Sequence, residues 1–482
     1  MTTKQRSNPR AGRRLAMIGL FGFTLAHASC SPVDTLPPNE QGGVGNIAIT
    51  SISPSVAAAQ GGVTVAIYGS GFAEGAEVAF GNRAAQQVQF VSSTHIQAQV
   101  PAAETGPGDA AVTVRNKDGS FAVGTKLFRY VRAVVSFDSE RIAVGTHPVA
   151  VIAEDTNGDN LPEIITANDA TNTVSVLPGN AGYKPGANYP TPVGPTALVL
   201  ADFDGNGYRD LALSCNNASG QDLAILGGTG GGGFGLPVTF SVGRNPTSLA
   251  AKDLTGDGKP DVVMAPRTGD VVYVLANTSN ASGVSFASGT PYALKANSAP
   301  SALVLQDLTG DVYPEILTAN YTSAAVSVFI GINGGTFGPA KHTAAPAETL
   351  ALAVADFSGD LKPDLAAVSF GSKTVSLFKG RGDGTFDPGA TVTTEKDPRG
   401  VAFSDLDGDG KQDLVVVNSG ADSVAIYLGN GDGTFDGPQT VTTGSTPYAL
   451  VVRDLNLDGK PDLVTANFNG NDVSILRNKT QR

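Results

Sequence analysis

The sequence predicts an all-β protein in which a small antiparallel sandwich precedes a seven-bladed β-propeller. Three observations lead to this fold class. A nine-residue acidic motif occurs seven times with first residues 47 to 54 positions apart, and a period near 50 is typical of a repeat architecture. Four short apolar strands accompany each copy, as in a propeller blade. Gly, Ser, Thr, Asn and Val are frequent and only 16% of residues are charged, which suits strands joined by many turns.

The first 29 residues are predicted to be an export signal. A basic stretch ends at Arg14 and is followed by an apolar run from Leu15 to Leu25. This run is too short to span a membrane, and the order of basic and apolar parts is that of a signal peptide. The chain is therefore expected to be exported.

Two ways of processing this signal stay open. Cleavage before Ser29 would release a secreted protein. Alternatively, Ala28-Ser29-Cys30 resembles a bacterial lipobox, which would make Cys30 the lipidation site of an outer-membrane or cell-surface lipoprotein. We favour the lipoprotein, because a Pro/Gly-rich tether over residues 30–46 follows the cysteine. Contact with a membrane is then expected only through this lipid anchor.

Residues 47–131 are predicted to form the sandwich. Alternating apolar residues predict strands, separated by Gly and Asn turns, at Val63–Tyr68, Glu77–Phe80, His95–Val100 and Ala111–Arg115. The segment resembles an IPT/TIG domain through Ile52-Ser-Pro54, Gly69-Ser-Gly71-Phe72, Val78-Ala-Phe80-Gly81 and Asn116-Lys-Asp-Gly119. That resemblance implies an immunoglobulin-like fold used as a spacer or a binding module.

Residues 132–482 are predicted to form the propeller. In each repeat one strand enters the acidic loop, a second leaves it, and a third and a fourth follow. The last repeat ends after its third strand, so we expect the ring to be closed by a strand from the start of the domain. Phe137 lies 18 residues before Asp155, much as Phe435 lies 19 residues before Asp454.

The acidic loops are predicted to bind calcium. They carry oxygen ligands at positions 1, 3, 5 and 9, and Ca²⁺ takes six to eight hard oxygen ligands, with the same 1-3-5 spacing in the first half of an EF-hand loop. The candidate metal ligands, loop by loop, are Asp155, Asn157, Asp159 and Glu163; Asp202, Asp204, Asn206 and Asp210; Asp253, Thr255, Asp257 and Asp261; Asp307, Thr309, Asp311 and Glu315; Asp356, Ser358, Asp360 and Asp364; Asp405, Asp407, Asp409 and Asp413; and Asp454, Asn456, Asp458 and Asp462.

The seven loops are not expected to bind equally well. Three have Thr or Ser at position 3, which are weaker neutral ligands, and the loop at Asp307 also lacks a glycine at position 6. The alternative reading is that these are Asp/Gly turns without a metal, because both residues favour turns. A carboxylate at positions 1 and 9 in all seven copies favours the metal.

The repeats resemble the FG-GAP/VCBS family found in the heads of integrin α-subunits and in bacterial surface proteins. The resemblance is carried by the full or nearly full Asp-x-Asp/Asn-x-Asp-Gly-x-x-Asp loops and by partial matches such as Phe337-Gly-Pro-Ala340. It implies a calcium-bound β-propeller that acts as a binding or adhesion module at the cell surface.

Net charge narrows the classes of partner. The formal charge is −12, and 22 of the 44 acidic residues lie in the seven loops. Bound calcium would nearly neutralise them, so the acidity indicates metal sites rather than a basic partner. Nucleic acid is not expected, because its binding rests on clustered Lys and Arg. The expected partner is an unknown protein or glycan ligand at the cell surface.

The sequence does not predict an enzyme, since it has no nucleophile elbow, zinc-protease motif or P-loop. A polysaccharide-active enzyme stays a minor alternative, and its groups would come from residues such as His147 or Arg399. A carbohydrate-binding propeller is the stronger alternative, although the absence of Trp disfavours it.

The end of the ring opposite the loops is the expected binding face. A proline precedes the first strand in six repeats, and the residues His147, Thr196, Thr247, Ser301, Arg399 and Tyr448 beside it are expected near the centre of that face. Asn168, Asn320, Asn418 and Asn467 are expected there too, either as turn caps or as part of a polar ligand surface. Cys215 occupies the same repeat position, as a substitution in a turn.

Overall fold

The computed structural model describes residues 46–480 apart from residues 60, 105–107, 132–134, 218–219, 221 and 243–244. The predicted signal, Cys30 and nearly all of the predicted tether lie outside these residues. The chain divides into two compact units, residues 1–131 and 132–482. Across the described residues the only helical element is a 3-10 turn, η1 (Gly179–Ala181), and none is long and apolar enough to cross a membrane.

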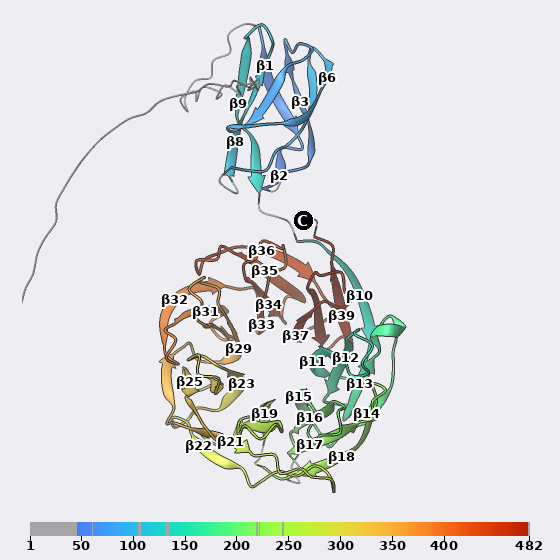
Figure 1. Cartoon of the computed structure of the whole chain (residues 1–482), viewed down its shortest axis with the longest axis vertical. Helices are drawn as coiled ribbons and strands as arrows, with labels where there is room; N and C mark the ends of the chain where they lie inside the picture. The colour runs from blue at the N-terminus through green and yellow to red at the C-terminus, as the bar shows by residue number, and fades with distance from the viewer. Residues whose placement is uncertain are drawn as a thin grey trace, which may run out of the picture. The chain divides into compact units, whose positions relative to one another are not determined.

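The first unit is a sandwich of two sheets (Figure 1). One sheet has the order β1-β3-β7-β6, with bounds Ala48–Ser53, Thr64–Ser70, His95–Gln99 and Gln86–Ser92. The other has the order β2-β9-β8-β4-β5, with bounds Val56–Ala58, Phe121–Val131, Gly108–Arg115, Glu77–Phe80 and Arg83–Ala84. Alternate residues such as Val65, Ile67 and Ile96 fill the core between the sheets. The sandwich is confirmed, but it is not wholly antiparallel, because β2 pairs with β9 in parallel.

Seven four-stranded sheets form the second unit within the described residues. Their first strands are β11 (Pro148–Glu154), β15 (Pro195–Ala201), β19 (Pro246–Lys252), β23 (Pro300–Gln306), β29 (Thr349–Ala355), β33 (Pro398–Ser404) and β37 (Pro447–Arg453). Their second strands are β12 (Glu163–Asn168), β16 (Asp210–Cys215), β20 (Asp261–Pro266), β24 (Glu315–Asn320), β30 (Asp364–Ser369), β34 (Asp413–Asn418) and β38 (Asp462–Asn467).

The outer half of each sheet is more variable in length. The third strands are β13 (Thr173–Leu177), β17 (Leu223–Gly228), β21 (Val271–Leu275), β25 (Ala325–Phe329), β31 (Thr374–Gly380), β35 (Ser423–Gly429) and β39 (Asp472–Asn478). The outer strands are β14 (Asn188–Pro190), β18 (Phe234–Phe240), β22 (Thr290–Ala293), β28 (Lys341–Ala344), β32 (Phe386–Thr393), β36 (Phe435–Thr442) and β10 (Phe137–Ala143). A two-stranded ribbon, β26 (Gly331–Ile332) with β27 (Thr336–Phe337), forms part of the connection between β25 and β28 of the fourth sheet.

The sheets of this unit are arranged as a ring with the first strands nearest its centre (Figure 1). Each first strand contacts the next, and β37 contacts β11, so the order is closed. The last sheet is completed by β10, which pairs with β39 from Phe137 opposite Asn478 to Ala143 opposite Asp472. The predicted β-propeller and its closure by an early strand are both confirmed.

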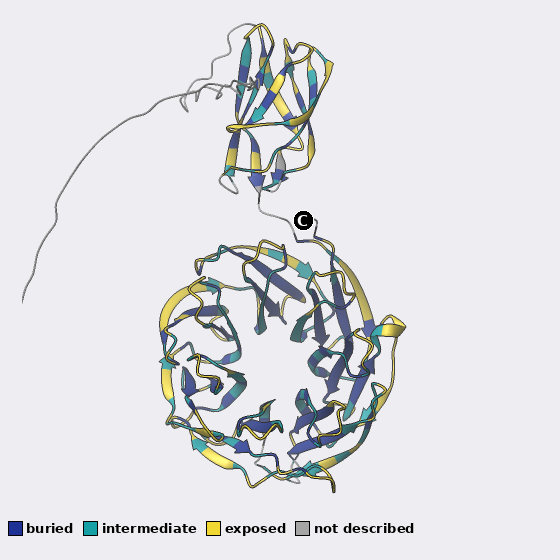
Figure 2. Cartoon of the chain, viewed as in Figure 1, coloured by how far each residue is buried: buried dark blue, intermediate teal, exposed yellow. Residues whose placement is uncertain are grey.

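The second strands form the most buried part of this unit. All six residues of each are buried, because a neighbouring sheet packs on either face (Figure 2). Clusters of aliphatic side chains join consecutive sheets, such as the one that packs Val464 and Ile475 of the last sheet against Ile164 of the first. Burial of both faces explains why these strands are continuous apolar runs instead of alternating ones.

The asparagines at the ends of the second strands are not on the surface, so the predicted polar ligand face is wrong at these four residues. Asn168, Asn320, Asn418 and Asn467 are fully buried. Asn467 donates from Nδ2 to Asp472 Oδ1 (2.7 Å) and to Ser474 Oγ (2.9 Å) on the third strand. The asparagines therefore hold the second hairpin from inside the sheet.

Cys215 takes the same place at the end of β16 and is fully buried as well. It is the final residue of a strand instead of part of a surface turn. Burial raises the pKa of its thiol to about 12, so the sulfur stays protonated and unreactive.

Asn418 is the exception among these asparagines. Neither atom of its side-chain amide has a hydrogen-bond partner. The register explains this, because the residue that corresponds to Ser474 is Ala425, which faces Val416 and has no hydroxyl.

We expect Ala425→Ser to stabilise the protein by about 1 kcal/mol, since it supplies the missing partner of Asn418. Ser474→Ala should do the reverse, by about 1–3 kcal/mol, because it removes the acceptor of the Gly444 N–H and one of the two acceptors of the Asn467 amide. Urea unfolding of both variants in excess calcium measures these changes. A less stable Ala425→Ser variant would contradict this explanation.

Candidate metal centres

The acidic loops all join the first strand of a sheet to the second, so the seven lie at the same end of the sheets. Positions 4 and 6 of every loop have a left-handed backbone conformation, even where glycine is absent. Val312 and Leu361, at position 6, have φ of 72° and 66°. The missing glycine at position 6 therefore does not change the loop at Asp307. At position 6 of that loop, Val312 has a strained backbone conformation and an exposed apolar side chain.

The acids at positions 1 and 5 organise the loop itself. The half-buried carboxylate at position 1 accepts the N–H of position 6 in all seven loops, at 2.8–3.0 Å. The exposed side chain at position 5 accepts the N–H of position 7, at 2.7–3.0 Å. These are Asx-type bonds that fix a turn, so part of the acidity has a structural use.

The acid at position 9 is the first residue of the second strand and is at most 1% exposed in every repeat. One of its oxygens accepts the N–H of loop position 2, at 2.6–3.1 Å. In six repeats the other oxygen accepts an N–H at or just beyond the end of the third strand. Examples are Gly429 on Asp413 and Asn478 on Asp462. This carboxylate therefore fastens the loop to two strands of its sheet.

Burial of these carboxylates disfavours their charged form. It raises the pKa of Asp413 to about 7, and it also raises the pKa values of Asp210, Asp261, Glu315 and Asp462. The backbone N–H bonds oppose this effect without cancelling it. A bound cation would favour the ionised form.

Position 2 of each loop has a role that was not predicted from the sequence. The residues there are Thr156, Phe203, Leu254, Leu308, Phe357, Leu406 and Leu455, and all are buried. They pack between sheets, and the carbonyl of Leu455 accepts the Tyr183 hydroxyl of the first sheet at 2.9 Å. An apolar residue in six of seven copies was the available signal.

Two loops bring three carboxylates together. Asp202, Asp204 and Asp210 each offer an oxygen within 4.8 Å of the other two, and so do Asp405, Asp407 and Asp413. Positions 1, 3 and 9, three of the four predicted ligand positions, thus converge in these two loops, and either cluster could hold a metal ion.

In the loop at Asp405 the carboxylate at position 5, Asp409, does not join the cluster. Asp409 instead accepts the Lys411 N–H and lies 3.4 Å from the Lys411 ammonium. Loops with acids only at positions 1, 5 and 9, such as the one at Asp253, form no group of three within the described residues.

The loops with neutral residues at position 3 nevertheless fit a cation. The hydroxyl oxygens of Thr255, Thr309 and Ser358 are buried and have no hydrogen-bond partner. A buried hydroxyl without a partner is costly. An oxygen in this state, next to two carboxylates, has the chemistry of a calcium ligand.

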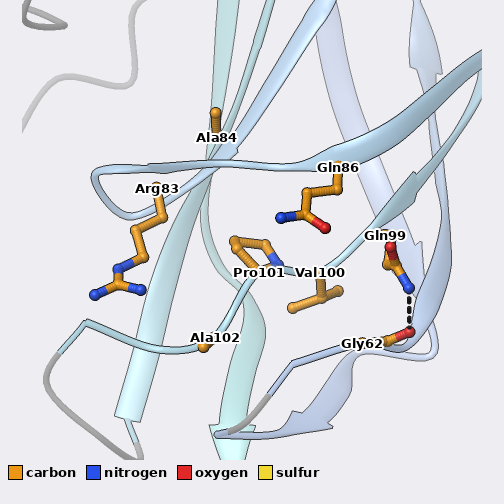
Figure 3. Close-up of a pocket in the computed structure, with 8 residues that line it drawn as sticks. All are labelled: Gly62, Arg83, Ala84, Gln86, Gln99, Val100, Pro101 and Ala102. Atoms are coloured by element: carbon orange, nitrogen blue, oxygen red, sulfur yellow. Dashed lines mark hydrogen bonds between the residues drawn. The ribbon is translucent and has the colours of Figure 1, made fainter.

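The first unit contains a separate pocket of about 550 Å³ (Figure 3). Its lining is mostly neutral, with Gln86, Gln99 and Pro101 on one side and Arg83 as its cation. Gln99 donates to the carbonyl of Gly62 at 3.0 Å, as the dashed line shows. Nothing in this lining forms a cluster of metal-ligating or nucleophilic groups.

A β-propeller with acidic loops at one end of its sheets defines the class of this protein. The model of the FG-GAP-like repeat matches six times, over residues 155–213, 202–264, 253–318, 307–367, 356–416 and 405–465. The model of the IPT/TIG domain matches residues 48–130. The chain therefore belongs to the FG-GAP-like repeat family and carries an IPT/TIG domain before its repeats.

No curated protein matches the chain. Among solved structures, BBS1N in complex with ARL6DN has 14% identity and a TM-score of 0.53, covering 72% of this chain and 98% of that one. An auxiliary nutrient binding protein from Bacteroides thetaiotaomicron has 11% identity and a TM-score of 0.46, covering 90% and 98%. A lectin from Agrocybe aegerita has 17% identity and a TM-score of 0.45, covering 76% and 96%. At these identities the likeness shows the fold alone, and the last two carry no argument.

In chelator, we expect the stability of the wild type relative to Asp413→Asn to fall as the pH rises from about 4 to about 7. A free Asp carboxyl loses its proton near pH 4, whereas Asp413 keeps its proton to about pH 7. The native state therefore binds more protons in this range, which makes its stability decrease with pH. Urea unfolding of both proteins across this range measures the difference.

The comparison with Asp413→Asn cancels the titration of all other groups, and any constant cost of the substitution leaves the slope unchanged. Saturating calcium should weaken the dependence, because the ion favours the carboxylate. A difference that grows with pH in favour of the wild type would contradict the assignment.

Proposed function

We propose that the protein is an exported binding or adhesion module built on a calcium-stabilised, seven-bladed β-propeller. The seven four-stranded sheets and the closed order of their first strands support this number of blades. The calcium part of the proposal rests above all on the two clusters of three carboxylates at Asp202 and Asp405. The ion would be structural and would take no part in a reaction.

The residues at positions 1, 3 and 9 would hold the ion in each loop. Its charge would offset the cost of burying the carboxylate at position 9, which already joins the loop to the second and third strands. It would also give the unpaired hydroxyls of Thr255, Thr309 and Ser358 a partner. Calcium supplies charge and coordination here, and these residues fix where it binds.

Binding of a partner is assigned to the end of the ring opposite the acidic loops. The loops there connect strands of a rigid scaffold, a setting that often carries binding sites. The residues before the first strands share one conformation, and His147, Asn245 and Asp397 all have φ between 54° and 57°. Different side chains are thus displayed from a common frame, as a binding face requires. A carbohydrate ligand is the second candidate, and its basis is developed below.

Calcium should raise the melting temperature of the chelated protein. At about 100 times its dissociation constant, each occupied site adds roughly 2.7 kcal/mol. Calorimetric titration after exhaustive chelation measures the sites directly. Asp204→Asn and Asp407→Asn should each weaken calcium binding, because they remove one carboxylate from a cluster of three.

The matched control is Asp383→Asn, an exposed aspartate that fixes a hairpin by accepting the Thr385 N–H. It should leave the calcium response unchanged. Identical melting curves in chelator and in calcium would sink the proposal that the loops hold metal.

Export through a lipid anchor is proposed from the sequence before residue 46. Expression of the full gene in a bacterium should place the wild type in the membrane fraction, labelled by a palmitate analogue. Cys30→Ser should abolish the label, whereas Cys215→Ser should keep it. A wild type recovered only as an unlabelled secreted protein would favour cleavage before Ser29.

A further inference from the structure

Five side chains from four consecutive sheets form one continuous stack at the end of the ring opposite the acidic loops. The rings of His147 and Phe468 are 4.2 Å apart at 15°, and those of Phe468 and Tyr448 are 4.5 Å apart at 15°. The Arg399 guanidinium carbon lies 3.9 Å from the Tyr448 centroid and 5.3 Å from that of Phe370. All five side chains are only partly buried.

The positions of these residues place the stack close to the centre of the ring. Arg399 and Tyr448 are second residues of the first strands β33 and β37, which lie innermost (Figure 1). Phe370 and Phe468 directly follow β30 and β38, and His147 directly precedes β11. These are the strand ends away from the acidic loops.

The Arg399 guanidinium is held in place with most of its donors unused. Its Nε donates to Ser419 Oγ at 3.1 Å, and Ser419 Oγ in turn donates to the carbonyl of Asp397 at 2.8 Å. Among the described residues, no acceptor is hydrogen-bonded to its two Nη atoms, and no carboxylate lies within 4.0 Å of the guanidinium. An arginine has five N–H donors, so four are left for a ligand.

Arg267, whose guanidinium carbon lies 4.7 Å from the Tyr321 ring centroid, likewise has no carboxylate of the described residues within 4.0 Å, whereas several other arginines of this unit are paired with acids. Arg141 is paired with Asp472, Arg453 with Glu154 and Arg477 with Glu140. The protein is acidic overall, yet the Arg399 guanidinium has no acidic partner among the described residues. A guanidinium fixed by stacking and by one hydrogen bond loses little further freedom when it binds a planar anion.

The surroundings of the stack combine uncharged hydrogen-bonding groups with carboxylates, since Asp422 Oδ1 accepts the Thr446 backbone N–H at 2.6 Å. Asn469, exposed and next to Phe468, donates to Thr446 Oγ1 at 2.7 Å. Asn471 accepts the His147 N–H through Oδ1 at 3.0 Å. Amides and hydroxyls beside an arginine match the hydroxyls and the carboxylate of a sugar acid better than the side chains of a peptide.

We propose that Arg399 binds the carboxylate of a uronic acid residue in an acidic glycan, with two parallel hydrogen bonds from the guanidinium. The proposal rests on the proposed function as a binding module and names the class of ligand. The stack of Phe370, Tyr448 and Phe468 positions the arginine, and the neighbouring Asn and Thr side chains bind sugar hydroxyls.

The test is fluorescence anisotropy of the purified protein with a labelled trisaccharide that ends in glucuronic acid, at constant calcium. Arg399→Gln should weaken binding about tenfold or more, the usual loss for a charge-assisted bidentate pair. Arg399→Lys should restore only part of the affinity, since an ammonium lacks the planar fork. Arg453→Gln is the control, because it removes the same charge near the acidic loops.

The methyl ester of the sugar acid makes the test specific to the carboxylate. It should weaken binding to the wild type and not weaken it further in Arg399→Gln, because both changes remove the same interaction. Equal affinity of Arg399→Gln and the wild type for the acid would overturn the proposal. So would binding of an oligoglutamate peptide without binding of the sugar.

The calcium response separates this inference from the proposed function. Arg399→Gln should keep the calcium-dependent melting temperature of the wild type, which shows that the fold is intact. A calcium-stabilised protein that binds no uronate at millimolar concentration would refute the inference alone. A protein without any calcium response would refute the calcium part of the proposed function, whatever the result with the sugar.

Discussion

The buried carboxylate at loop position 9 is the interaction on which the second unit depends most. In one side chain it joins the turn, the start of the second strand and, in six repeats, the end of the third. The same burial penalises its charge, as the raised pKa of Asp413 shows. A proton or a bound cation would therefore stabilise this buried carboxylate, which also holds the sheet together. Metal dependence, where it occurs, is a consequence of how the sheet is fastened.

The two ends of the sheets are stabilised by different residues: acidic side chains at one end and buried asparagines at the other. At one end, acids at positions 1 and 5 bond to the backbone of their own loop and hold its shape. At the other, buried asparagines fix the hairpin between the second and third strands from inside. Arg399 and Tyr448 at that end are half-buried and stack on each other, and the proposed ligand would contact them there.

The sequence made the architecture predictable because the repeat is visible in every copy. The period, the four strands per repeat and the distance from Phe137 to Asp155 led to a closed propeller, and the structure pairs β10 with β39 accordingly. The spacing also predicted converging ligands, and three carboxylates converge at Asp202 and Asp405, the two loops that have an acid at position 3 as well as at positions 1 and 9. For the first unit, alternation predicted the strands but not the parallel pairing of β2 with β9.

What the sequence hid depends on neighbours from other repeats. Asn168 and Cys215 are buried because neighbouring sheets pack on both sides of their strands. The type of residue at these positions does not indicate this burial. The partnerless hydroxyls of Thr255 and Ser358 appear only once the atoms around them are placed. The stack from His147 to Phe370 joins residues more than 200 positions apart, and no local pattern reveals it.

The pairing of β10 with β39 also sets the order in which the chain can fold. Six sheets are contiguous in sequence and can form as each one emerges, but β10 has no partner until Asn478 has appeared. A chain that is still being synthesised therefore has an open ring. The hydrogen bonds that close the ring form only once β39 is complete, and any truncation before Asp472 would leave the ring open.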